Sequence, residues 1–152
     1  MKTALVIILW SAASVLWGQP SNRAQISTNV EHMKNFSAYF QLKKYPEAIA
    51  EAEKMNGRPE MPLHLLPDLA IAYDQISKPA EAMAALGRIR EKYKESPQSG
   101  GLLLAVTKLS DNRAKLKHAN VKAEISKLLK ELPPREKLLE ETIFKARKNS
   151  PR

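Results

Sequence analysis

Residues 38–50 read AYFQLKKYPEAIA, and residues 72–84, which begin 34 positions later, read AYDQISKPAEAMA. Seven of these thirteen positions are identical in the two copies, and Leu42 and Ile76 make a similar pair at an eighth. A proline near the middle of each copy indicates a turn that leads into a new helix. The spacing of 34 residues therefore predicts a repeated unit of two helices joined by a tight connection.

The apolar residues of the second copy fall on one side of each expected helix. They are Leu66, Leu69, Ala70 and Tyr73 in the first helix, and Ala82, Leu86 and Ile89 in the second. Small residues allow two helix backbones to approach closely, and an aromatic ring fills the space beside them. We therefore expect Ala48 and Ala82 to lie between paired helices, and Ala85 to lie on the outer face.

The two copies and the proline that follows the second, Pro97, resemble the tetratricopeptide repeat, a unit of 34 residues. The resemblance is good over about residues 38–97 and loose beyond. It implies an all-α fold, a short right-handed superhelix of antiparallel helix pairs with two clear repeats, a degenerate third and a C-terminal capping helix. The expected helices are 28–43, 46–56, 63–76, 79–94, 102–110, 114–132 and 135–148. In the last of these, Leu138, Leu139, Ile143 and Ala146 are expected to face inward.

The N-terminal segment is typical of a secretory signal peptide. Lys2 precedes an apolar run from Ala4 to Trp10, small residues extend the run, and polar residues begin at Gln19. We expect a signal peptide over 1–21, a linker over 22–28, the helical domain over 29–148 and a tail over 149–152. The protein would then be exported, to a periplasm or as a secreted protein. An uncleaved N-terminal anchor and a buried first helix are the alternatives.

The net charge of +9 is concentrated towards the C-terminus. Residues 108–152 contain thirteen Lys or Arg and six Asp or Glu. This excess predicts either an ordinary solvated surface or a basic contact surface for an acidic protein, anionic lipid or anionic envelope polymer. The residues expected to form that surface are Lys115, Lys117, Lys122, Lys127 and Lys130.

No arrangement of residues in the sequence indicates catalysis. The chain has no cysteine, which excludes disulfides, thiolate metal sites and a cysteine nucleophile. His64 and Asp68 have the spacing of a helical metal pair, but no third ligand type is near. His32 and His118 have no ligand type three or four positions later. We expect no enzyme activity, metal or cofactor, and basic residues without interleaved aromatic residues are weak evidence for nucleic acid.

The resemblance also implies a binding surface, because in this family the first helix of each pair lines a concave groove that receives peptides or helices. The positions that match are Ser37, Phe40, Gln41, Ile71, Asp74, Gln75 and Lys108. Phe40 could also pack against a neighbouring helix. Two functions follow as hypotheses: a scaffold that binds a protein or peptide in the groove, and a binder of anionic lipid or polymer through the basic C-terminal helices. Neither hypothesis fixes the oligomeric state.

Overall fold

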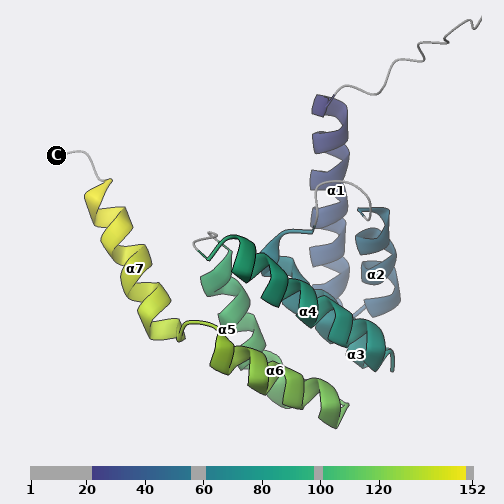
Figure 1. Ribbon diagram of the computed structural model, residues 1–152. Helices are drawn as coiled ribbons and strands as arrows, with labels where there is room; N and C mark the ends of the chain where they lie inside the picture. Colours follow the sequence, from purple (N-terminus) through teal and green to yellow (C-terminus); the bar gives the residue numbers. More distant parts are fainter. Residues whose placement is uncertain (1–21, 56–60, 98–100, 150–152) are drawn as a thin grey trace, which may run out of the picture.

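The computed structural model describes residues 22–55, 61–97 and 101–149. Within these ranges the chain forms seven α-helices and two short 3-10 helices, with no strand among them (Figure 1). The expectation of an all-helical chain is confirmed. The elements in order are α1 (Asn22–Gln41), α2 (Tyr45–Lys54), η1 (Leu63–Leu65), α3 (Leu66–Gln75), α4 (Pro79–Glu95), α5 (Leu102–Asn112), η2 (Arg113–Lys115), α6 (Ala119–Glu131) and α7 (Arg135–Lys148).

The turns that join α1 to α2 and α3 to α4 have the same backbone geometry. Lys43 has a φ of 58° and Ser77, 34 positions later, has a φ of 62°. The amide of Lys44 donates to the carbonyl of Tyr39 at 2.9 Å, and the amide of Lys78 donates to that of Tyr73 at 2.9 Å. This pattern is the Schellman motif, in which one left-handed residue lets the last carbonyls of a helix find donors. The repeat read from the sequence is therefore a repeat of local structure.

The small residues that the repeat relates are buried alike. Ala48 and Ala82 are both fully buried in the hydrophobic core, where α2 contacts α1 and α4 contacts α3. Tyr39 and Tyr73 are half-buried and pack against the same core. The structure corrects one expectation, because Ala85 is only 3% exposed and does not lie on an outer face. Ala84 is the exposed residue at this point of α4.

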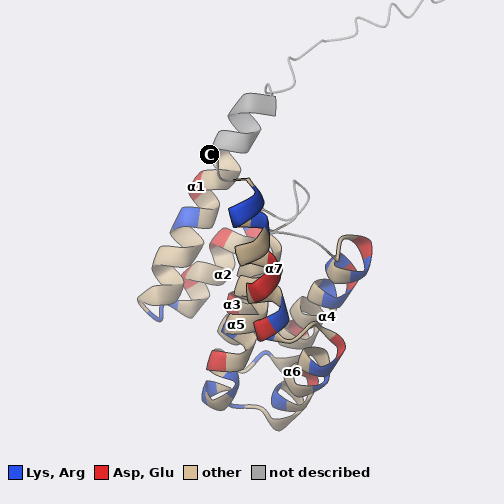
Figure 2. Ribbon diagram, turned by 90° about the vertical axis from the view of Figure 1, so that its left-hand side faces the viewer, with Lys and Arg blue, Asp and Glu red and all other residues tan. Residues whose placement is uncertain are grey.

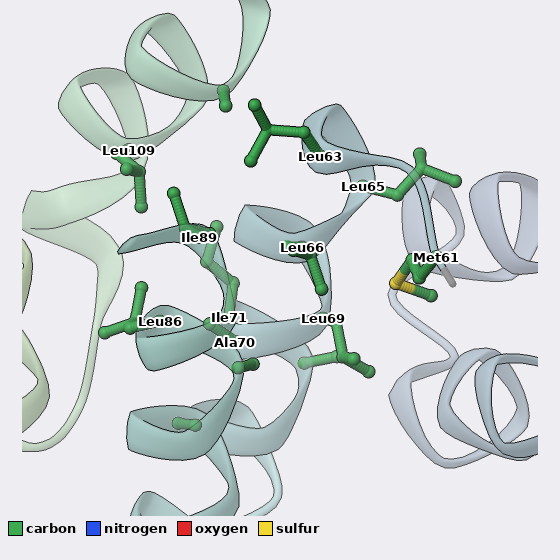
Figure 3. Packing of buried hydrophobic residues seen from close by; sticks show 14 of the residues in the cluster. Met61, Leu63, Leu65, Leu66, Leu69, Ala70, Ile71, Leu86, Ile89 and Leu109 are labelled. Carbon is green, nitrogen blue, oxygen red and sulfur yellow. The ribbon is translucent and has the colours of Figure 1, made fainter. Parts of the chain in front are cut away.

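The third helix, α3, lies at the centre of the molecule, in contact with α2, α4 and α5. Most of its residues are buried, so its sequence is apolar all round and not along one stripe. Figure 3 shows Leu66, Leu69 and Ile71 extending from this part of the chain among side chains of neighbouring segments. Burial on every side leaves α3 little free surface of its own.

The next two helices extend the arrangement, because α5 contacts α3 and α6 contacts α4. Arg90 of α4 links the latter pair through Glu124 and Glu131 of α6, each at 2.5 Å. The helix expected over 114–132 begins only at Ala119. The residues before it are held in another conformation by contacts with α3, which are described below.

The last helix covers less of the molecule than the expected cap. It contacts α5, but Leu138 is its only buried residue, while Leu139 and Ile143 are 47% and 44% exposed. Leu132 and Pro134 are both extended, which redirects the chain before α7 begins. Figure 1 shows the C-terminal part of α7 projecting away from the other helices. The apolar stripe read from its sequence is therefore mostly exposed to solvent.

At the N-terminal side, helix α1 begins at Asn22, so the segment 22–28 that was expected to be a linker is helical. The expected signal peptide over 1–21 lies outside the described residues, as does 150–152 of the expected tail. Among the helices that the structure describes, none is long and apolar enough to span a membrane.

Candidate peptide-binding groove

One face of α1 forms a wall of an open groove of about 500 Å³. Six residues of α1 line the groove, and they are alternately three and one positions apart in the sequence, which places them on a single helical face. They are Val30, Met33, Lys34, Ser37, Ala38 and Gln41. This face carries both apolar and polar residues, so a bound chain would meet hydrophobic contacts and hydrogen-bonding groups together.

The opposite wall of the groove consists of His64 and Leu65 of η1. Two features of α5 hold this wall in place. Lys108 donates from Nζ to the carbonyl oxygen of His64 at 2.9 Å. At Gly101 a Cβ atom would lie 3.2 Å from the backbone nitrogen of His64, so a glycine allows the start of α5 to approach η1 closely.

Burial and the charges behind this wall together affect the protonation of its imidazole. Burial, together with the ammonium of Lys108, lowers the pKa of His64 below its ordinary value of 6.5, and Asp68 opposes this change. At neutral pH the ring is therefore uncharged and can both donate and accept a hydrogen bond. Lys108 also forms an ion pair with Asp68. Burial raises the pKa of Asp68, and the hydrogen bond and charge of Lys108 oppose that rise.

Two of the residues predicted from sequence, Ser37 and Gln41, line this groove. Phe40 belongs to the contact between α1 and α2. Its ring stacks on Phe36, with 6.2 Å between centroids, and meets the edge of Tyr45 at 5.8 Å. The alternative reading of Phe40, packing against a neighbouring helix, is therefore the one that the structure shows.

Ile71 and Asp74 are buried and do not line an open groove. Ile71 is 4% exposed, within the hydrophobic core. Asp74 is fully buried. Its carboxylate accepts hydrogen bonds from the backbone amides of Lys117 at 2.6 Å and His118 at 3.1 Å, and its Oδ1 lies 2.8 Å from Nδ1 of His118. Asp74 therefore fixes the segment that precedes α6, and these contacts explain why α6 starts late.

Gln75 and Lys108 are also used within the chain. Gln75 donates from Nε2 to the carbonyl oxygen of Lys115 at 3.0 Å. The backbone carbonyl oxygen of Gln75 accepts from Nζ of Lys117 at 2.5 Å. Lys108 supports η1, as described above. Gln41 and Gln75 occupy equivalent repeat positions, but only Gln41 is available to a ligand in the groove.

The five lysines of the expected basic surface have different surroundings. Lys115 and Lys117 are both bonded within the chain, the former to Asn112 at 3.1 Å. The other three lie on α6, where Lys127 and Lys130 are exposed and Lys122 is half-buried. In the view of Figure 2, Lys and Arg lie among Asp and Glu along α6 and the first part of α7, whereas the end of α7 carries basic residues without acidic ones.

The sequence reading did not identify Val30, Met33, Lys34, Ala38 and Leu65 as groove residues. The spacing of the α1 residues, which places them on one helical face, was the available signal. In the described part of the chain, no three His, Asp or Glu side chains lie together as a metal site would require.

Comparison with models of protein families, with curated proteins and with solved structures found no match for this chain.

Proposed function

We propose that this chain is an exported scaffold that binds a peptide or helix of a partner protein in the groove between α1 and η1. The scaffold would be a short right-handed superhelix of the tetratricopeptide type and would have no catalytic activity of its own. The observation that supports this best is the continuous face from Val30 to Gln41 opposite His64 and Leu65. The matching geometry of the two repeat turns supports the choice of family.

The groove is suited to a polypeptide for two reasons. Its apolar members, such as Met33 and Leu65, can take a hydrophobic side chain, while Ser37 and Gln41 can bond to a peptide backbone without reading its side chains. The uncharged ring of His64 adds a further donor and acceptor. The second wall of the groove is also held in place by the hydrogen bond from Lys108 to the backbone of His64, so little ordering is required upon binding.

The alternative, binding of anionic lipid or polymer through the basic C-terminal helices, has weaker support. Lys115 and Lys117 donate hydrogen bonds to their own chain. Along α6, Glu124 and Glu131 lie among the remaining lysines, although both are paired with Arg90. Binding that falls steeply with added salt would favour this alternative over the groove.

Site-specific photocrosslinking in the producing cells tests the proposal. A photoreactive phenylalanine replaces Ala38, which lies in the groove, or Ala50, which is exposed on α2 and outside the groove. We expect a discrete adduct with a polypeptide from position 38 only, and a weaker adduct when Gln41→Ala is added. Equal adducts from both positions, or none from position 38, would contradict the groove. Recovery of a shortened chain outside the cytoplasm tests export separately.

A further inference from the structure

A second pocket, of about 160 Å³, lies between α2 and α4, with α3 as its floor. It exists because the residues at this point are small: Ala52 on α2, and Ala84 and Ala85 on α4. Leu69 and Tyr73 of α3 form the floor. An engineered cavity of about 150 Å³ holds one benzene molecule, so this pocket has room for about one side chain.

The rim of this pocket has an excess of negative charge, although the chain as a whole is basic. Glu53 comes from the end of α2 and Glu81 from the first turn of α4, and Arg88 is the one cation among the described residues that line the pocket. Burial raises the pKa of the Tyr73 hydroxyl, and the negative charges of Glu53 and Glu81 raise it further, while Arg88 lowers it. Both carboxylates are therefore close enough to affect the ring at the floor of the pocket. Within the described part of the chain, the side-chain carboxylate of neither glutamate forms a hydrogen bond or an ion pair.

We propose that this pocket binds a lysine side chain presented by a partner polypeptide. The unbranched stem of lysine fits a narrow pocket with apolar walls, while its ammonium lies between Glu53 and Glu81. The ring of Tyr73 beneath adds an attraction of the cation for the aromatic face. An uncharged apolar side chain would fill the same space but would leave both carboxylates without a partner. This site uses different residues from the α1–η1 groove, so each can be tested alone.

The repeat supplies matched controls for this site. The positions 34 residues before Ala84 and Glu81 are Ala50 and Glu47, which are exposed and do not line the pocket. Ala84→Leu fills the pocket from its exposed side, while Ala50→Leu makes the same change at the equivalent position of α2. Glu81→Gln and Glu47→Gln form a second pair, in which a surface charge is removed without a change of size.

The experiment is an amide NMR titration of the full chain with a blocked five-residue peptide that contains one central lysine. We expect saturable shifts at Leu69, Tyr73 and Ala84, and binding of the same peptide with norleucine to be weaker by about tenfold, because charge-assisted hydrogen bonds are lost. Ala84→Leu should abolish these shifts and Ala50→Leu should not.

Glu81→Gln should weaken binding by about threefold, the size of an exposed ion pair, while Glu47→Gln leaves it unchanged. Equal affinity for the norleucine peptide, equal binding by the two leucine variants, unchanged binding by Glu81→Gln, or shifts confined to other regions would each overturn the proposal.

Discussion

Replacement of Asp74 tests how α6 is attached to α3. This carboxylate accepts three hydrogen bonds from the segment before α6 while being fully buried. In Asp74→Asn an amide nitrogen replaces one of the two carboxylate oxygens. Oδ2 accepts from Lys117 and Oδ1 accepts from His118, so the nitrogen faces a donor in either orientation of the amide. The change therefore removes at least one hydrogen bond and brings two donors together, although the two side chains have nearly the same size.

The expected cost follows from those contacts. A hydrogen bond to a charged group contributes about 1.5–3 kcal/mol, and a buried donor left without a partner costs about 1–3 kcal/mol. Because Lys117 is exposed and water can partly replace the lost acceptor, we expect Asp74→Asn to reduce the free energy of unfolding by about 2–4 kcal/mol. That is a large share of the stability of a small domain.

Urea unfolding measures this cost, with Asp111→Asn as the control. Asp111 is exposed on α5 and undergoes the same chemical change. We expect the midpoint of Asp74→Asn to fall well below that of Asp111→Asn, and the amides of Lys117 and His118 to exchange faster with deuterium. Matching midpoints for the two variants would refute the view that Asp74 attaches α6 to α3.

Three further predictions concern packing and titration. Ala82→Leu should lower the free energy of unfolding by about 1–3 kcal/mol through overpacking, whereas Ala84→Leu, at an exposed position, should change it by less than about 0.5 kcal/mol in urea melts. The pKa of His64 is lowered in the folded state, so the unfolded chain binds its proton more readily and stability should fall as pH drops below 6.5. Melts of His64→Gln should show a smaller loss over that range, and an unchanged loss would contradict this assignment. Because Glu81 raises the pKa of Tyr73, Glu81→Gln should lower it, which ultraviolet titration of the phenol would detect; no change would place the carboxylate away from the ring.

The sequence alone predicted the helices, and it related the two turns to one another. These features depend on contacts within a few residues, such as the i to i+4 hydrogen bond and the proline that opens α2 or α4. Five of the seven expected helices start and end close to the observed residues, while α1 starts six residues early and α6 starts five residues late. The late start of α6 arises because Asp74, more than forty positions away, takes the hydrogen bonds that the segment would have used.

Tertiary structure alone decided which residues of the expected groove are available. Gln41 and Gln75 have the same place in the repeat, but Gln75 is bonded to Lys115 because the third helix pair packs on the second. Gln41 belongs to the first described helix pair and remains exposed beside η1. Likewise, the apolar stripe of α7 did not become a cap, because the extended residues before it direct the helix outward. A pattern along the chain specifies which side of a helix is apolar, whereas the neighbour that covers that side depends on how distant segments meet.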